Sequence, residues 1–119
     1  MTYIEGFIAA VPVANKDAYV EHAAGFAPLI REFGATRMVE SWSDDVPEGK
    51  VTDFRMAVKA KPDETVVFSW ILWPSKAAHD AGMKGAMEDL RATMGAMPFD
   101  GSRMIFGGFR TIVDVGGAG

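Results

Sequence analysis

Hydrophobic side chains run continuously or in alternation through four stretches of the chain, and turn-forming residues bound each stretch. β-Branched and aromatic residues are frequent in them, as is typical of β-strands. The clearest stretch is TVVFSWILW, residues 65–73, which ends at Pro74. The pattern therefore predicts strands at residues 3–11, 36–43, 65–73 and 103–115. Gly107-Gly108 interrupts the last one and indicates a bulge or the close approach of a ligand or partner.

A first amphipathic helix is predicted over residues 16–33, where large apolar side chains recur every three or four positions. Asn15 is placed to cap its start, and Gly34 is placed to end it. Pro28 inside the segment is expected to kink the helix. The apolar stripe consists of Tyr19, Phe26, Leu29, Ile30 and Phe33, with Ala18 and Ala23.

A second helix is predicted over residues 76–93, with Ser75 as its cap. Its apolar stripe consists of Met83, Met87, Leu90 and Met94. Gly82 and Gly85 lie inside this segment, and each is expected to weaken the helix by about 1 kcal/mol relative to Ala.

The segment between the second and third strands has no clear period. Residues 43–50, SDDVPEGK, combine turn formers with acidic groups and predict the main exposed loop. Residues 51–62 fit either an extended segment or one or two helical turns capped by Thr52, and we favour the short helix.

The predicted order of strand, helix, strand, strand, helix, strand is the split βαβ pattern of ferredoxin-like folds. It places two helices on one face of a four-stranded antiparallel sheet, an α+β class. We expect a single domain over residues 1–115 and a flexible tail, GGAG, over residues 116–119.

Both faces of this sheet are predicted to be hydrophobic. In the third strand one face carries Val66, Phe68, Trp70 and Leu72, and the other carries Val67, Ile71 and Trp73. Leaving a large apolar side chain exposed forgoes roughly 1.5–3 kcal/mol. Because the two helices cover only one face, the other face predicts a homodimer that meets face to face about a twofold axis.

Composition narrows the function classes. The 119 residues include 49% hydrophobic and 24% charged residues, values typical of a globular protein. Twelve basic against 16 acidic residues give a net charge of −4, and no basic cluster is present, so nucleic acid is not an expected partner. The absence of cysteine excludes disulfides, thiolate metal sites and a cysteine nucleophile. The first residues have no signal-peptide or membrane-helix pattern, so we expect a cytoplasmic protein without a membrane partner.

Four segments, YIEGFIAAVP, SDDVPEGKVTDF, DETVVFSWILWPS and MPFDGSRMIFGGF, carry a family resemblance across nearly the whole chain. Together they resemble a bacterial family of small proteins of unknown function in the dimeric α/β-barrel superfamily. The resemblance implies a ferredoxin-like subunit paired into a barrel, and it carries over no catalytic residues. Some similar proteins are labelled as RNA components of the signal recognition particle, a role that the acidic charge balance opposes.

Glu40 and His22 are the candidate acid–base residues. Glu40 stands between Met38 and Trp42 at alternate strand positions, and a carboxylate on an apolar face tends to have a raised pKa, as a general base requires. The alternative for Glu40 is an ion pair with an arginine across the sheet, such as Arg37, Arg103 or Arg110. His22 lies on the helical stripe, where it could accept a proton, bind haem iron or hydrogen-bond a backbone carbonyl. Glu5 has the same two interpretations as Glu40, whereas His79 is expected on the surface.

Aromatic side chains could line a pocket for a flat ligand, or they could simply form the core. The candidates for ligand contact are Tyr19, Trp42, Trp70 and Phe106. The acidic groups Asp44, Asp45, Glu48 and Asp53 could offer oxygen atoms to a cation, but their spacing is not that of a calcium loop, and a solvated loop is favoured.

Three functions remain open. The first is a dimer that binds a small, flat, largely apolar molecule between helices and sheet, with polarity supplied by His22 and Glu40. The second, suggested by the resemblance, is an enzyme similar to cofactor-light monooxygenases or isomerases, in which Glu40 or His22 removes a proton beside a carbonyl. The third is a structural or interaction module that acts through loop 43–50. No cofactor or metal is expected.

Overall fold

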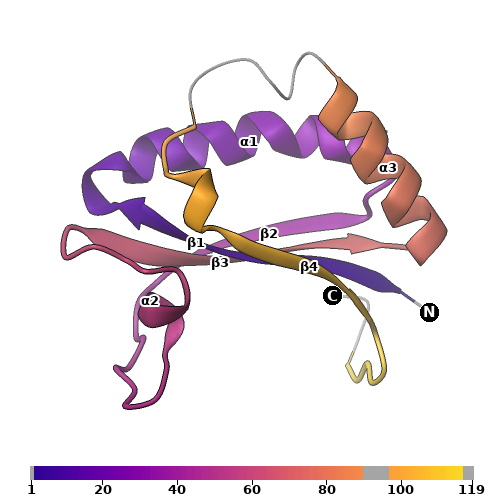
Figure 1. Cartoon of the computed structure of the whole chain (residues 1–119). Coiled ribbons are helices and arrows are strands. Elements are labelled where there is room, and N and C mark those ends of the chain that lie inside the picture. The colour runs from indigo at the N-terminus through magenta and orange to yellow at the C-terminus, as the bar shows by residue number, and fades with distance from the viewer. Residues whose placement is uncertain (1, 90–96, 117–119) are drawn as a thin grey trace.

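The computed structural model describes residues 2–89 and 97–116, and its strands and helices follow the split βαβ order (Figure 1). The strands are β1 (Tyr3–Pro12), β2 (Arg37–Trp42), β3 (Glu64–Trp73) and β4 (Ile105–Arg110). The helices are α1 (Lys16–Glu32), α2 (Phe54–Ala57) and α3 (Lys76–Glu88), with short 3-10 turns η1 (Val13–Asn15) and η3 (Gly101–Arg103).

The sheet has the strand order β2-β3-β1-β4, and every neighbouring pair is antiparallel. This order agrees with a ferredoxin-like α+β fold. α1 and α3 lie across the same face of the sheet (Figure 1). The sequence prediction of a four-stranded antiparallel sheet with two helices on one face is confirmed.

α1 begins at the predicted residue and ends one residue before the predicted Phe33, and Asn15 occupies its N-cap without a side-chain capping hydrogen bond. The Asn15 side chain donates a hydrogen bond from Nδ2 to the carbonyl of Pro98 at 2.9 Å instead. Gly34, at φ +113°, ends the helix in the left-handed region that favours glycine. Pro28 lies within the helix.

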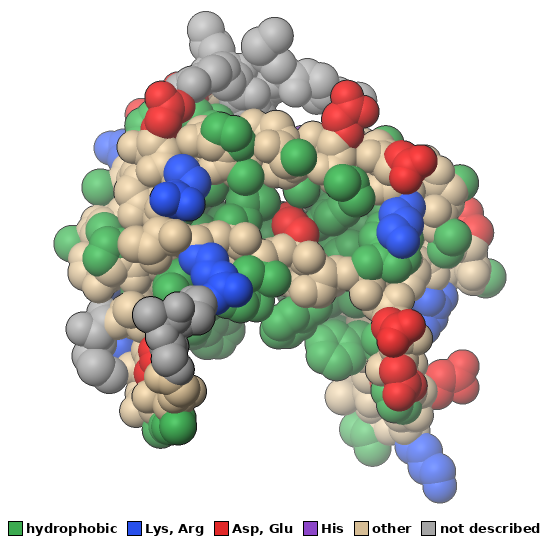
Figure 2. All heavy atoms as spheres, turned by 180° about the vertical axis from the view of Figure 1, so that it is seen from behind, with side chains coloured by type: hydrophobic (Ala, Val, Ile, Leu, Met, Phe, Trp, Pro, Cys, Tyr) green, Lys and Arg blue, Asp and Glu red, His purple; other side chains and the backbone are tan. Residues whose placement is uncertain are grey.

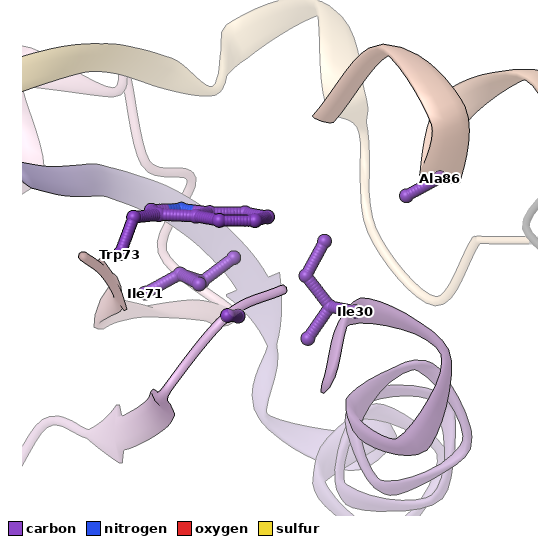
Figure 3. Packing of buried hydrophobic residues seen from close by; sticks show 5 residues of the cluster. Ile30, Ile71, Trp73 and Ala86 are labelled. Atoms are coloured by element: carbon purple, nitrogen blue, oxygen red, sulfur yellow. The ribbon is translucent and has the colours of Figure 1, made fainter. Parts of the chain in front are cut away.

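The core between the helices and the sheet centres on Trp73, whose side chain is fully buried. Figure 3 shows its indole lying over Ile71, with Ile30 of α1 and Ala86 of α3 on the helix side. α3 packs very closely here, because a Cβ added at Gly82 would lie 2.3 Å from the Trp73 ring. Gly82 therefore allows α3 to approach the indole. Helix propensity predicts only that this glycine weakens the helix, and it does not predict this packing role.

Residues 51–62 contain the short helix that we favour from the sequence, namely α2, but Thr52 is not its cap. Asp53 occupies the N-cap, and its carboxylate accepts hydrogen bonds from the backbone N–H of Met56 at 2.7 Å and of Gly49 at 2.9 Å. An aspartate is the stronger capping residue, and here it also ties the loop to α2.

The last strand is shorter than predicted and contains no bulge. β4 ends at Arg110, which lies opposite Tyr3 at the start of β1. Pairing is continuous through Gly107 and Gly108, and a Cβ at Gly108 would lie 2.4 Å from the Tyr3 hydroxyl, so close approach explains this glycine. The predicted second helix is observed to Glu88, and its expected continuation through Leu90 and Met94 lies outside the described residues.

The face of the sheet opposite the helices is open and apolar. It carries Phe68, which is 49% exposed, and Phe109, which is 61% exposed. α2 with its preceding loop and the segment after β4 project from the two sides of this face (Figure 1). Figure 2 shows hydrophobic side chains gathered in the hollow between these two projections. The concavity measures about 590 Å³ and is lined by Ile4, Gly6, Phe7, Ile8, Phe68, Ser69, Trp70, Ile105, Phe106, Gly107 and Phe109.

Candidate functional site

A groove of about 310 Å³ lies between α1 and β2, on the helix side of the sheet. It is lined by Lys16, Tyr19, Val20, Ala23, Ala24, Ala27, Met38, Glu40, Ser41 and Trp42. α1 contributes small alanines along the groove, and β2 contributes alternate residues because Met38, Glu40 and Trp42 point toward the helix layer. The groove is therefore apolar except for a few defined polar groups.

Glu40 is the central polar group of this groove. The Tyr19 hydroxyl donates to Glu40 Oε1 at 2.8 Å, and the Ser69 hydroxyl donates to the same oxygen. Ser69 lies directly opposite Glu40 in the β2–β3 register, and both Ser69 and Tyr19 are buried. Both donors converge on one carboxylate oxygen, so Oε2 receives neither of these hydrogen bonds.

Burial governs the protonation of this site. Desolvation raises the pKa of Glu40 above its ordinary value, while the hydroxyls of Ser69 and Tyr19 and the nearby His22 partly offset that increase. The pKa of Tyr19 is also raised, chiefly by its burial and then by the adjacent carboxylate, so the phenol remains protonated and acts as a donor. The groove thus holds a carboxyl group that binds a proton more tightly than a solvated glutamate.

Aromatic rings wall the groove. The Trp42 ring lies 6.3 Å from that of Tyr19, and the ammonium of Lys16 lies 5.6 Å from the Trp42 ring centre. The Phe99 ring lies 5.7 Å from that of Tyr19 and packs against the same core cluster as Trp42. Flat surfaces and one cationic group therefore accompany the carboxyl of Glu40.

The structure brings together part of the residue set predicted from the sequence. Tyr19, Glu40 and Trp42 line this groove, and His22 is half-buried and interacts electrostatically with Glu40. Trp70 lies instead at the open concavity on the other side of the sheet. Phe106 lies on the edge strand β4 opposite Phe7, is 70% exposed, and does not line the groove. The aromatic candidates do not form one pocket.

The observed partners of Glu40 are hydroxyl groups, whereas the sequence also allowed an arginine. Arg103 binds Glu64 through two hydrogen bonds of 2.7 Å, and it also contacts Asp100 at 3.0 Å. Arg37 lies over the ring of Trp70 on the opposite face, 5.5 Å from the ring centre. Two of the three arginines considered are thus engaged elsewhere.

A second polar cluster, missed in sequence analysis, lies beneath the first turn of α3. The expectation that His79 is on the surface is wrong: its side chain is only 14% exposed, and its ring contacts those of Tyr3 and Trp73 at centroid distances of 4.8 and 5.7 Å. His79 Nε2 lies 3.6 Å from Oε2 of Glu5, and Nδ1 lies 2.8 Å from Asp80 Oδ1.

Three atoms of this second cluster are buried without a hydrogen-bond partner among the described residues: Glu5 Oε2, His79 Nε2 and Trp73 Nε1. Desolvation raises the pKa of Glu5, and His79 partly offsets the increase. A sequence signal for this burial existed, because His79 lies three and seven positions before the buried Gly82 and Ala86 on the same helical stripe.

The acidic loop forms no evident cation site in the described structure. Within residues 2–89 and 97–116, no group of three or more His, Cys, Asp or Glu side chains is arranged to hold a metal ion. Asp53 instead uses both carboxylate oxygens to bind the backbone of Gly49 and Met56. In the same described ranges, every helix is too short or too polar to cross a bilayer.

The fold and the groove define a small α+β protein that holds a half-buried carboxyl group between one helix and the edge strand of an antiparallel sheet. The chain belongs to the family described as "Protein of unknown function (DUF1428)", whose profile matches residues 2–101. It is 59% identical over 116 residues to the "Uncharacterized protein YbaA" of Escherichia coli strain K12 and of Shigella flexneri, covering 96% of this chain and 99% of each relative. The resemblance to a family of unknown function is confirmed.

Proposed function

We propose that this protein is a homodimer that binds a small, flat, largely apolar molecule in the groove between α1 and β2. The observation that carries this proposal is the placement of the Glu40 carboxyl, with its two hydroxyl donors on Oε1, at a largely apolar groove of about 310 Å³. Apolar walls with a small number of oriented polar groups are the usual design of a small-molecule site.

The chemistry of Glu40 specifies one feature of the ligand. Tyr19 and Ser69 hold the carboxyl in place through Oε1, which leaves Oε2 for the ligand. An ionised carboxylate accepts a hydrogen bond, so a hydroxyl or N–H group on the ligand is favoured. The ring of Trp42 offers a surface for stacking on a planar ligand.

A matched pair of probes tests this site. 2-Naphthol carries a hydroxyl donor, and 2-methoxynaphthalene has the same ring system without that donor. We expect 2-naphthol to quench Trp42 fluorescence and to bind more tightly than the methyl ether by about tenfold, the effect of one hydrogen bond to a charged group. Trp42→Phe identifies the signal from this tryptophan among the three in the chain.

The Glu40→Gln variant isolates the carboxyl, because its amide keeps the shape and an oxygen acceptor for Tyr19. The preference for 2-naphthol should fall several-fold in this variant, while Glu21→Gln on the exposed side of α1 serves as the control. If neither probe binds, or if Glu40→Gln leaves their ratio unchanged, the groove is not the site proposed. Native mass spectrometry of freshly purified protein would add the mass of any ligand carried from the cell.

A second candidate function uses the same carboxyl as a general base. The raised pKa of Glu40 favours it, because a base that holds its proton more tightly is a better acceptor from a weak carbon acid. In this reaction Glu40 removes a proton beside a carbonyl, an enolate forms, and a proton returns to carbon. Exchange of the C1 hydrogens of 2-tetralone in deuterium oxide measures it: catalysis by the protein that Glu40→Gln abolishes supports the role, and exchange at the buffer rate opposes it.

Dimerisation through the open face of the sheet is supported by the side chains found there. Phe68, Ile105 and Phe109 are each 44% or more exposed in one chain, although they belong to one apolar concavity. A contiguous apolar patch of this kind is unusual on a monomer and marks an interaction surface. A second copy offers the same patch, so a twofold axis buries both patches at once.

A further inference from the structure

The polar groups of the groove between α1 and β2 lie in a fixed order along its length. The ammonium of Lys16 contacts the ring of Trp42, and Tyr19, further along α1, donates to Glu40. These two contacts show that β2 runs opposite to α1 across the groove. Lys16 therefore stands at one end, the carboxyl of Glu40 lies further in, and Met38 makes the other end apolar.

The charge of Lys16 is not neutralised by a carboxylate in the part of the chain that the structure describes. None of the ion pairs found there includes Lys16, and its ammonium lies 5.6 Å from the centre of the Trp42 ring instead. Glu40 takes its side-chain hydrogen bonds from hydroxyl groups. Asp17, in the first turn of α1, is exposed and is not among the residues that line the groove. This end of the groove thus holds a positive charge that a ligand can use.

Two features keep positive potential at this end of the groove. A cation within about 6 Å of an aromatic face is attracted by the ring, so Trp42 favours the observed place of the ammonium. Lys16 is also the first residue of the 17-residue helix α1, and the N-terminus of a helix carries partial positive charge. The whole chain has a net charge of −4, so the attraction of an anion to this end is local.

We propose that the ligand of this groove is a planar aromatic carboxylate, whose carboxylate binds Lys16 at the Trp42 end and whose hydroxyl or N–H group faces Glu40. This inference rests on the proposed function and names the class of ligand. Glu40 and Trp42 are two residues apart on β2, which corresponds to about 7 Å along a strand. A fused two-ring acid with its hydroxyl on the far ring spans this separation and remains flat and largely apolar.

The number of charges favours a carboxylate over a phosphate group. The single ammonium of Lys16 balances the one negative charge of a carboxylate, whereas a phosphate monoester carries about 1.5–2 negative charges at neutral pH. Among the described residues that line the groove, Lys16 is the one cationic side chain, and Glu40 faces the same space. The additional charge of a phosphate group would therefore lie unpaired near a carboxyl group.

Two probes that differ in one charge test the proposal. 6-Hydroxy-2-naphthoate and its methyl ester share the ring system and the hydroxyl, and only the acid is negatively charged. Equilibrium dialysis against the full-length protein at neutral pH and low salt measures both affinities. We expect the acid to bind at least about threefold more tightly, the effect of one exposed ion pair. This preference should shrink as salt is added, because salt screens charges at a protein surface.

Variants of Lys16 assign the preference to one side chain. Lys16→Gln removes the charge and keeps a polar side chain, so the preference for the acid over the ester should disappear. Lys16→Arg keeps the charge and should keep most of the preference. Lys50→Gln, on the exposed loop 43–50, changes the net charge by the same amount and is the matched control, because Lys50 does not line the groove.

The outcomes separate this inference from the proposed site. If the acid and the ester bind the wild type equally well, the carboxylate subsite is overturned and the groove remains a site for neutral flat molecules. A preference that survives in Lys16→Gln, or that Lys50→Gln abolishes equally, overturns the role of Lys16. If neither probe binds, the proposed function fails, and this inference fails with it.

Discussion

The hydroxyl of Tyr19 on α1 donates to the carboxyl of Glu40 on β2 at 2.8 Å, and this contact spans the groove at its polar end. Tyr19 is 4% exposed, so the bond joins helix and sheet away from bulk water. The hydroxyls of Tyr19 and Ser69 both favour the ionised form of Glu40. The Tyr19 hydrogen bond therefore affects the pKa of Glu40 as well as the stability of the fold.

Replacing Tyr19 with Phe should raise the pKa of Glu40 further, since one of the hydrogen bonds that lowers it is lost. The free energy of unfolding should fall by about 1 kcal/mol, the net value of one buried hydrogen bond. Carbon-13 NMR of the Glu40 carboxyl reports the pKa, and urea denaturation reports the stability. An unchanged carboxyl titration would show that the two groups are not coupled in solution.

Glu40→Gln should stabilise the protein at alkaline pH while impairing ligand binding. A raised folded-state pKa means that the native protein binds this proton more tightly than the unfolded chain does. The resulting stabilisation is fully present below the unfolded pKa and is lost as pH rises through the folded pKa. Wild-type stability should therefore decline across this window more than that of Glu40→Gln, as urea denaturation at a series of pH values can measure. Equal slopes would contradict the assignment.

The Glu64–Arg103 pair should have the opposite pH dependence. Hydrogen bonds from Arg103 lower the pKa of Glu64 to about 2, and the Glu64 side chain is 5% exposed. Stability from this pair is present above the unfolded pKa and is lost as pH falls toward 2. Arg103→Gln should destabilise the protein at neutral pH, because the Glu64 carboxylate loses both hydrogen bonds from the guanidinium, and it should flatten the acid limb of the stability profile. Lys76→Gln, which removes an exposed pair with Asp80, is the control and should cost little.

Gly82→Ala and Gly25→Ala should have effects of opposite sign. A Cβ at Gly82 would lie 2.3 Å from the Trp73 ring and 2.5 Å from the carbonyl oxygen of Phe33, so α3 must move away from the core. We expect a loss of about 1–3 kcal/mol from overpacking. A Cβ at Gly25 in α1 meets no atom within 4 Å, so its replacement should stabilise by about 0.5–1 kcal/mol through helix propensity. Thermal unfolding compares them directly; a stabilising Gly82→Ala would refute the packing described.

Phe68→Asp should convert the proposed dimer into a folded monomer. Phe68 is 49% exposed on the open face and contacts the Phe54 ring edge-on at 6.1 Å, so its replacement leaves the helix-side core intact. Light scattering coupled to size exclusion measures the mass, and circular dichroism verifies the fold. Val51→Asp, on the loop before α2, is a matched exposed control. A Phe68→Asp variant that remains dimeric would exclude this face as the interface.

Hydrophobic periodicity was sufficient to predict the succession of four strands and two helices along the chain, because burial on one side of a sheet or helix leaves a periodic pattern of apolar residues. Glu40 could be identified for the same reason: its alternation with Met38 and Trp42 places it toward the helices. The hydroxyl partners of Glu40 were less accessible, because Ser69 meets it through strand register and Tyr19 through the packing of α1 on β2.

The errors come from contacts between distant segments. The expectation that His79 lies on the surface is wrong: its spacing from Gly82 and Ala86 indicates a buried stripe, but the sequence does not identify Tyr3 and Trp73 as the rings that enclose it. The predicted strand 103–115 extends past the observed end of β4 at Arg110. The residues after Arg110 have a high strand propensity, but β1 begins at Tyr3, opposite Arg110, so the ladder with β1 ends there. Propensity describes which residues can form a strand, and only the tertiary structure determines whether a partner is present.

Ala23, Ala24 and Ala27 line the groove along α1, and each contributes only a methyl group to its wall. If the groove binds a ligand as proposed, the size of that ligand is consequently limited by side chains that carry no polar group. Enlarging one alanine would restrict the accepted molecules to narrower ones while the Glu40 carboxyl kept its hydroxyl donors. In the proposed site, selectivity for ligand size and selectivity for ligand polarity would thus be carried by different residues, and each could change in evolution without the other.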